Sequence, residues 1–509
     1  MKIKPNNARW AVAVATLGLM TGCSDSGDGS QSENDIVLAQ LIEAQSLTGD
    51  PSTGRDLPEI TDEVAQLGMK LFYSKSLGGG FDSACVTCHH PVLGGGDNLS
   101  LPVGVDAEEV DLLGPGRIHD VDGAPNVPRN APTVFNLGMW DSSLFHDSRV
   151  QTLSSVEGTN GAGADISTPD SGLNTADANA GANLSEAQAR FPVTSAEEMR
   201  TEAFENGNGN TAVRDHLAGR LGNYGTGTGE LATNDWLTEF QTAFGSTADA
   251  ETLITYDNIA TALAEYERSM VFVDSPWSNY VAGDSDALTD QQKEGAILFF
   301  TASDEGGAGC SSCHSGDFFT DEGHHTVAFP LIGNGKGDTN NDNSNDDFGR
   351  GRVTGEEDDR YRFRTPSLLN IEVTAPYGHV GSYQTLEDVV RHYTNPRQQV
   401  TDYFDNGGWC QLDQFEDMAG CAALYPDAET NSVLALDKLD TDRSAGESEF
   451  PTNLDLTDEQ VAQLVAFLEA LTDPCVEDRS CLAPWIPDTS DTGPDGNQLN
   501  AVDEDNELL

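Results

Sequence analysis

The residues with the most specific chemistry in this sequence form two short motifs, at 85–89 and 310–314. Each motif reads Cys-x-x-Cys-His, which is the attachment signature of c-type haem. Two cysteines three positions apart lie on one face of a helical turn, so both thiols can add to the two vinyl groups of one haem, and the adjacent histidine can bind the iron. A zinc site would require four protein ligands, and a histidine directly after each cysteine pair favours haem over a zinc half-site or a thioredoxin-like dithiol. The motifs therefore predict two covalent haems, held by Cys85, Cys88, His89, Cys310, Cys313 and His314.

Sequence features around the two motifs recur in the same order, which indicates an internal duplication. A Gly-x-x-Leu-Phe segment precedes each motif, an Arg- and Pro-containing segment follows it, and a His-x-x-x-x-Gln-Thr-Leu segment comes last. The copies lie at 68–72 and 295–299, at 129–136 and 364–370, and at 146–153 and 379–386. Three matches in one order predict two tandem haem domains.

The other segments indicate a mainly α-helical protein with long loops. Thr-x-x-Gln capping boxes at 289–292 and 457–460 are typical of helix starts, and the second precedes an apolar stripe with helical spacing. We expect a further helix over 253–271. A loop over 155–183 is rich in glycine and asparagine, and so is a second over 333–347. The second loop has oxygen ligands suited to calcium but lacks EF-hand spacing, so we interpret it as a solvated loop.

The composition is strongly acidic. Lysine and arginine number 26 against 85 aspartate and glutamate residues, which gives a formal net charge of −59. Such a surface repels nucleic acid and anionic membranes, so neither is expected as a partner. The charge suits solubility in a salty medium, where screening weakens self-repulsion, and it also suits a basic redox protein as partner. Both interpretations stay open at this point.

The N-terminal residues predict a targeting segment. Basic residues precede an apolar run over 10–20 that is too short to span a bilayer. The run ends in Leu-Met-Thr-Gly-Cys, which resembles a bacterial lipobox. We therefore expect a lipoprotein signal peptide over 1–23, acylation of Cys23, and a flexible polar tether over 24–45. Ser24 favours the outer membrane, so the expected location is the periplasm, with membrane contact only through the lipid.

Four cysteines remain outside the haem motifs and the lipobox, and they fall into two close pairs. They are Cys410 with Cys421 and Cys475 with Cys481. Local disulfides in an oxidising compartment are the natural interpretation, although four cysteines permit three connectivities.

Taken together, these motifs resemble the bacterial di-haem cytochrome c peroxidase family, including its MauG-like subgroup. The resemblance runs from about residue 67 to residue 471. It rests on both haem motifs and on the segments at 129–133, 145–149, 192–199, 374–382 and 385–390. It implies two tandem class I cytochrome c-like domains with their haems near the domain interface. The expected ranges are 46–283 for the peroxidatic haem domain, 284–475 for the electron-transfer haem domain, and 476–509 for an acidic tail.

The resemblance also assigns site residues. By residue type alone, Glu198 is a surface acid in a very acidic chain. The family's distal glutamate, which would move a proton between the two oxygens of peroxide, nevertheless falls on Glu198, and its glutamine falls on Gln188. The family's calcium site, between the domains, maps onto Asn130, Thr374 and Pro376.

The two halves differ where a second iron ligand would come from. The segment after Leu386 leads to His392 and Tyr393, either of which could cap the second iron, whereas the matching position in the first half is Asn160. We therefore expect one capped iron for electron storage and one open iron for peroxide. The resemblance favours Tyr393, since MauG-type members have tyrosine there and other peroxidases of the family have methionine. A tyrosinate ligand should lower the haem potential.

Two further histidines carry expectations from the resemblance. His146 stands where the family usually has a tryptophan between the haems, which weakens the case for strong haem–haem coupling. It is either a packed, hydrogen-bonded histidine or a contact of a haem propionate. His119 resembles the histidine that caps the peroxidatic haem in resting enzymes, so it is a tentative iron ligand, although residues 97–118 resemble an insertion before it.

Three functions follow from these expectations. The first is a di-haem peroxidase that reduces hydrogen peroxide with electrons from a small donor protein, a cytochrome c or a cupredoxin. The second is MauG-like oxidation of side chains on a partner protein through a high-valent haem. The third is a non-catalytic di-haem electron carrier, for which Gln188 and Glu198 would have no purpose.

Overall fold

The computed structural model describes residues 32–337, 345–448, 450, 454–490 and 492–509. Its regular structure is mainly helical, as predicted, and its strands are only two or three residues long. The predicted signal peptide with Cys23, and part of the 333–347 loop, lie outside the described residues. No helix of the described residues is both long and apolar enough to cross a membrane.

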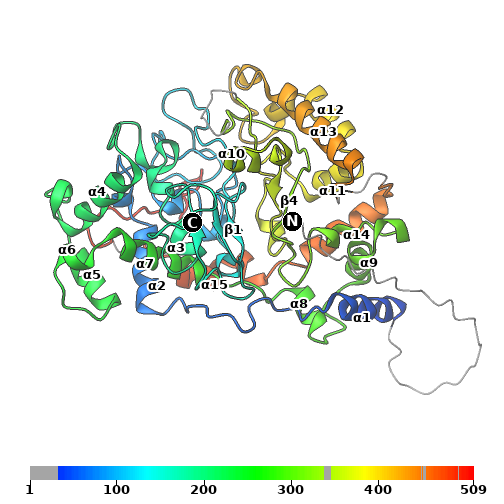
Figure 1. Ribbon diagram of the computed structural model, residues 1–509, viewed down its shortest axis with the longest axis horizontal. Coiled ribbons are helices and arrows are strands. Elements are labelled where there is room, and N and C mark those ends of the chain that lie inside the picture. Colours follow the sequence, from blue (N-terminus) through cyan, green and yellow to red (C-terminus); the bar gives the residue numbers. More distant parts are fainter. Residues whose placement is uncertain (1–31, 338–344, 449, 451–453, 491) are drawn as a thin grey trace, which may run out of the picture.

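The helices divide between two halves of the chain, which we define as residues 46–283 and 284–475, and two helices lie outside them (Figure 1). The first half contains α2 Glu63–Phe72, α3 Leu184–Gln188, α4 Asn210–Gly222, α5 Trp236–Ala243, α6 Ala250–Leu253, α7 Tyr256–Arg268 and α8 Pro276–Val281. The second half contains α9 Asp290–Phe300, α10 Arg350–Thr354, α11 Leu386–Thr394, α12 Pro396–Asp405, α13 Ala428–Ala445 and α14 Asp458–Glu469. Outside the halves are α1 Glu33–Gln45 and α15 Arg479–Leu482.

The predicted helix starts are confirmed. Thr289 caps α9 and Thr457 caps α14, each in a complete capping box. The helix expected over 253–271 is present as α6 and α7, separated by a short break at 254–255.

Two small antiparallel sheets accompany the helices. The first has the order β1-β2-β3, with Ser143 opposite Gln151 and Gln151 opposite Ser167. Its strands are β1 Ser143–Leu144, β2 Val150–Thr152 and β3 Ile166–Ser167. The second sheet pairs β4 His324–His325 with β5 Phe363–Arg364, placing His324 opposite Arg364.

A similar helix crossing recurs in each half and explains the repeated glycine. Gly68 of α2 lies against α7, where an added Cβ would come within 1.9 Å of the Ala262 carbonyl oxygen. Gly295 of α9 lies against α14, where an added Cβ would come within 1.9 Å of the Gln463 carbonyl oxygen. Only glycine lets two helix backbones approach this closely. Each crossing forms the centre of a separate hydrophobic core.

The segment predicted as a flexible tether over 24–45 is corrected by the structure from residue 33 onward. Glu33–Gln45 forms α1, which packs on the second half with Leu38 fully buried. Asp35 binds Lys293 of α9 at 2.8 Å and accepts a hydrogen bond from the Tyr280 hydroxyl at 2.8 Å. Only residues 24–35 are polar in composition, and the apolar residues that follow them, including Leu38, form the face that packs on the core.

The acidic residues 476–509 return to the first half, and we call them the C-terminal strap. Figure 1 shows the chain leaving α14 and ending over the first half. Val476, Leu482 and Leu499 are buried in the core around α2 and α7. Asp495 accepts hydrogen bonds from Ser76 at 2.6 Å and from the Trp236 indole at 2.7 Å. The expected acidic tail is therefore a packed part of the first half's core.

The two disulfides join the cysteines within each close pair. One joins Cys410 to Cys421 beyond α12, with their Cα atoms 5.8 Å apart. The other joins Cys475 to Cys481 at the beginning of the strap, with Cα atoms 5.3 Å apart.

Candidate haem sites in a shared cavity

Both Cys-x-x-Cys-His motifs open onto one continuous cavity between the halves. The first three residues of each motif form a single 3₁₀ turn, at Cys85–Thr87 and at Cys310–Ser312. The four thiols of the motifs are free, and all six motif residues line the cavity. The turn therefore presents two thiols and one imidazole to the same space in each half.

The two motif histidines are held in the orientation that iron binding requires. The Nδ1 atom of His89 lies 3.2 Å from the Gly95 carbonyl oxygen, and that of His314 lies 3.1 Å from the Phe319 carbonyl oxygen. A histidine that donates from Nδ1 keeps a lone pair on Nε2 for a metal. Burial lowers the pKa of His89 to about 4 and also lowers that of His314, so both imidazoles are neutral near pH 7.

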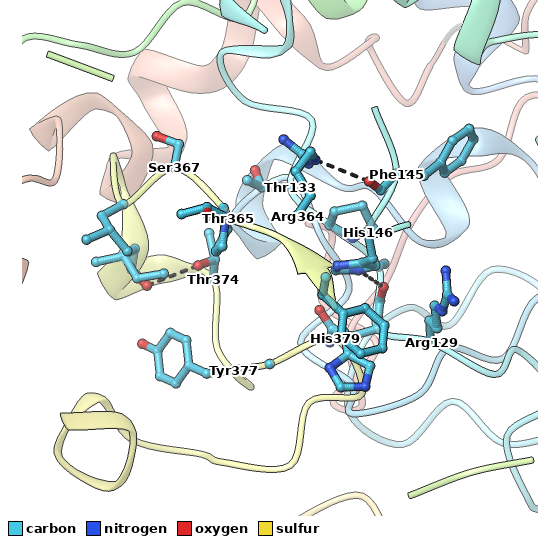
Figure 2. A pocket seen from close by; sticks show the side chains of 18 of the residues that line it. Arg129, Thr133, Phe145, His146, Arg364, Thr365, Ser367, Thr374, Tyr377 and His379 are labelled. Carbon is cyan, nitrogen blue, oxygen red and sulfur yellow. Dashed lines mark hydrogen bonds between the residues drawn. The ribbon is translucent and has the colours of Figure 1, made fainter. Parts of the chain in front are cut away.

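Unpaired buried donors at the cavity wall match the acidic groups of a haem. Figure 2 shows Arg364 of β5, His379 and His146 gathered at one part of the wall. Among the described residues, Arg364 Nη1 and His379 Nε2 are buried without a hydrogen-bond partner. A buried donor is expected to have an acceptor, and haem propionates would supply one. The residues present therefore fit c-type haem.

Glu198 and Gln188 lie in the same cavity as His89. Glu198 belongs to a single π-turn, Ala196–Arg200, whose start is fixed by a hydrogen bond from the Glu198 amide to the Ser195 hydroxyl at 3.3 Å. Gln188 is the last residue of α3, and its side-chain oxygen is buried without a partner among the described residues. A carboxylate and an unsatisfied amide thus face the first haem motif's cavity, where a small polar molecule would meet both.

In the second half, Tyr393 lines the cavity and His392 does not. The ring of Tyr393 stacks on Phe450, with centroids 5.1 Å apart, and burial raises the pKa of its phenol. His392 is fully buried, and both its nitrogens are engaged, with the Tyr383 hydroxyl at 2.9 Å and the Val327 carbonyl at 2.9 Å. Of the two expected ligands, the geometry favours Tyr393.

The first half has no comparable ligand at the matching position. Asn160 is buried outside the cavity lining. Its amide donates to the carbonyl oxygens of Leu137 at 3.2 Å and Trp140 at 2.9 Å, and its side-chain oxygen accepts from Ser185 at 3.0 Å. The asymmetry between the halves therefore extends from the sequence to the side-chain geometry.

His119 is not among the described residues that line the cavity. Its Nδ1 atom lies 3.5 Å from the Asp122 carboxylate and accepts a hydrogen bond from the Val121 amide at 3.4 Å. The structure therefore does not bring His119 together with the other expected site residues.

The residues expected at the calcium site lie on the wall of the same cavity. Asn130, Thr374 and Pro376 all line it. The Asn130 amide nitrogen donates to the Leu99 carbonyl at 2.8 Å, which directs the side-chain oxygen away from that contact. An amide oxygen and backbone carbonyls are ligands that suit Ca²⁺.

His146 is packed and hydrogen-bonded where residues of the two halves meet. Its Nε2 atom lies 3.1 Å from the Asn130 carbonyl oxygen, and its own carbonyl accepts from the Arg364 amide at 2.8 Å. Burial lowers its pKa to about 4. His146 also lines the cavity, so this neutral imidazole lies between the segments that carry the two haem motifs.

A buried ion cluster behind His146 was not foreseen from the sequence. Arg129 binds both oxygens of Asp347 at 2.6 Å and one oxygen of Asp147 at 2.7 Å, and all three side chains are buried. Burial alone would raise the pKa of each carboxyl, but the neighbouring arginines outweigh it and hold both below their ordinary value. The cluster joins the first half to the second. Arg129 and Asp147 were visible only as motif residues and Asp347 only as part of a loop, with no signal that joins the three.

A lysine from the second half was also missed. Lys336 lines the cavity, and its Nζ atom lies 3.9 Å from Glu198 Oε1. A lone lysine in a loop has no pattern that distinguishes it from a solvent-exposed residue.

Several known proteins are similar to this chain over much of its length. A family model for di-haem cytochrome c peroxidase matches residues 62–286. The methylamine utilization protein MauG of Methylorubrum extorquens is 28% identical over 394 residues, which cover 75% of this chain and 83% of that protein. The cytochrome c551 peroxidase of Pseudomonas aeruginosa is 28% identical over 331 residues, 65% of this chain and 71% of that protein.

Solved structures share the fold at low sequence identity. A MauG-like protein associated with microbial copper homeostasis has a TM-score of 0.53 at 22% identity, covering 86% of this chain and 98% of that chain. The diheme peroxidase BthA of Burkholderia thailandensis has a TM-score of 0.51 at 22% identity, covering 88% and 92%. The chain is therefore similar to bacterial di-haem cytochrome c peroxidases and to MauG.

Proposed function

We propose that this protein is a di-haem peroxidase that reduces hydrogen peroxide to water with electrons from a small redox protein. The observation that carries the proposal is the asymmetry of the shared cavity. Tyr393 faces it from the second half, whereas the first half contributes Glu198 and Gln188 and has no ligating side chain at the position of Asn160. One iron would therefore keep an open face for peroxide.

His89 and His314 would hold the two irons, and the four motif cysteines would attach the porphyrins. Bound in this way, haem supplies the redox chemistry, and the protein supplies orientation, protons and electrostatics. The overall reaction consumes one hydrogen peroxide, two electrons and two protons and releases two waters. The electrons come from the donor protein, and the protons come from solvent.

Glu198 is the proton carrier in this proposal. Its carboxylate takes the proton from the inner oxygen of peroxide and returns it to the outer oxygen, which leaves as water. The Gln188 amide, unsatisfied in the cavity, would orient the peroxide.

Tyr393 would cap the second iron as a phenolate. Burial by itself opposes the charged form of this phenol, and the positive charge of a bound ferric iron would reverse that preference. Strong charge donation from oxygen lowers the potential of the haem. The second site would then store one oxidising equivalent while the first reacts.

Several finer assignments belong to the same proposal. Each half would be a class I cytochrome c-like domain, and the recurring crossings at Gly68 and Gly295 support this. Calcium would bind Asn130, Thr374 and Pro376. The protein would act in the periplasm, anchored to the outer membrane through Cys23, and its acidic surface would receive a basic cytochrome c or cupredoxin.

Ligand binding and turnover test the proposal together. The purified di-haem protein is expected to reduce hydrogen peroxide with a reduced cytochrome c or cupredoxin, and cyanide should shift the Soret band of one haem only. Absence of turnover with every reduced donor would refute the peroxidase assignment. A Soret band that cyanide leaves unchanged in both oxidation states would indicate two capped irons, as in an electron carrier.

A second candidate, oxidation of side chains on a partner protein, is favoured by one observation. Tyr393 supplies the oxygen ligand that the resemblance associates with MauG-type members. His146, in place of a tryptophan between the haems, argues against it. Addition of peroxide should produce a near-infrared band from two coupled high-valent haems if this candidate is correct, and no such band in an ordinary peroxidase.

A further inference from the structure

Lys336 enters the first haem motif's side of the cavity from the second half. Three features fix the backbone around Lys336. Arg352 donates a hydrogen bond to the Lys336 carbonyl oxygen at 2.7 Å, and the Gly337 amide donates one to the Asp346 carbonyl oxygen at 2.9 Å. Gly335 has a φ of 59° and lies against the Asp346 backbone. An added Cβ at Gly335 would come within 2.2 Å of the Asp346 carbonyl oxygen. The turn that presents Lys336 is therefore specified by its own packing.

The ammonium group of Lys336 and the carboxylate of Glu198 face each other at 3.9 Å. Both residues line the haem cavity together with His89 and Gln188. Both also line a smaller adjoining pocket, with Arg149 as a third shared wall residue. The pair thus lies where the two spaces meet, next to the place where peroxide would reach the open iron.

The charges around Lys336 leave Glu198 as its main acidic neighbour. Arg129 and Arg149 are nearby cations, and Asp147 is the other nearby acid. Asp147 is already bound to Arg129 at 2.7 Å and to Arg149 at 3.1 Å. Burial, together with Arg149 and Arg129, lowers the pKa of Lys336 to about 8, although Glu198 and Asp147 oppose the shift.

We propose that Lys336 is a distal cation of the first haem site, supplied by the second half, which stabilises negative charge on an anion or leaving oxygen at the open face. The inference rests on the proposed peroxidase function. When the O–O bond breaks, the outer oxygen carries negative charge until Glu198 returns the proton. An ammonium group beside it stabilises that charge.

Anion binding tests this role without any turnover. Fluoride is titrated against the ferric di-haem protein and followed by its absorption spectrum, for wild type, Lys336→Met and Lys336→Arg. Lys336→Met is expected to weaken fluoride binding about tenfold or more, and Lys336→Arg to keep it within about threefold, because only the charge-retaining variant preserves the interaction. Lys70→Met, on α2 and paired with Glu239, is the matched control with unchanged affinity.

A neutral ligand distinguishes an electrostatic role from a structural one. Carbon monoxide binding to the reduced first haem should be the same in wild type and Lys336→Met. Equal losses of carbon monoxide and fluoride affinity would show that Lys336 only holds the two halves together, and unchanged fluoride affinity in Lys336→Met would refute its role as a distal cation. A wild-type protein that binds neither ligand would refute the open iron and, with it, both proposals.

The pH dependence provides a second measurement. Lys336 is charged below its pKa, so fluoride affinity in wild type should fall as the pH rises through about 8. Lys336→Arg should retain its affinity to higher pH, since a guanidinium stays protonated. A wild-type affinity with no change between pH 7 and pH 9, or an identical fall in Lys336→Arg, would contradict the assignment.

Discussion

Gly68 of α2 lies so close to the Ala262 carbonyl oxygen of α7 that a single added carbon would come within 1.9 Å of it. Gly295 repeats this relationship with Gln463 in the second half. The repeated glycine therefore lies at the helix crossing in the core of each half.

Gly68→Ala should lower the stability of the first half, because the added methyl forces two backbones apart. Overpacking of this kind costs about 1–3 kcal/mol, so the thermal transition of the haem-loaded protein should shift downward by several degrees. Gly209→Ala is a matched control, since nothing lies within 4 Å of a Cβ there. Equal melting of the two variants would contradict the crossing.

Glu198→Gln should remove the proton carrier while leaving the shape of the site unchanged. The expected loss in the rate of peroxide reduction is about 10²–10⁴-fold, the usual contribution of general acid–base catalysis, with the haem content unaltered. Glu197→Gln tests specificity, because Glu197 is the exposed neighbour outside the cavity lining. Stopped-flow absorbance after peroxide addition measures both. If the two variants react equally fast, Glu198 is not the carrier.

Tyr393→Met should raise the potential of the second haem, since a thioether donates less charge to iron than a phenolate. A rise of at least about 100 mV is expected from this change of axial ligand, and redox titration by absorbance measures it. Tyr403→Phe serves as the control, because Tyr403 lies outside the cavity lining and has a buried hydroxyl group. A potential that does not move in Tyr393→Met would show that another group caps the iron.

Arg129→Met should destabilise the junction of the halves, because it leaves Asp347 and Asp147 buried with one cation fewer. Breaking a buried ion pair from one side costs about 3–5 kcal/mol, measurable by denaturant unfolding. The folded-state pKa of both aspartates is depressed, so their contribution is complete above the ordinary pKa of about 4. This contribution to stability is lost as the pH falls from about 4 through the lower pKa values that the two aspartates have in the folded protein.

This acid-induced loss should therefore be visible below about pH 4 in wild type and smaller in Arg129→Met. Asp347→Asn offers a further comparison, since it removes one of the two carboxylates that bind Arg129. An identical acid profile in wild type and Arg129→Met would exclude the cluster as a source of stability.

The parts of this molecule that sequence could predict are those with a local pattern. The haem motifs have a fixed spacing, and Thr289 and Thr457 cap their helices through residues three positions away. Gly68 and Gly295 could be recognised because the duplicated sequence has a glycine at the matching position in both halves. In each case the residues that indicate the structure lie within one helical turn or occur at matching positions in both halves.

The parts that could not be predicted depend on contacts between distant segments. Glu198 and Lys336 meet only because a loop of the second half reaches the first, and neither residue has a local pattern that indicates this contact. Leu38 anchors α1 directly after the polar residues 24–35, whose composition suggested that the tether continues to residue 45. His119 lies outside the cavity lining although its local sequence resembles that of a haem ligand.

The C-terminal strap has a consequence for assembly. Leu499 and Val476 close the core around α2 and α7, yet a ribosome makes them after the whole second half. The core beside the first Cys-x-x-Cys-His motif is thus incomplete until residues beyond the second half have been made. Removal of the strap is therefore expected to destabilise the first half of the chain, although the strap follows the second half in sequence.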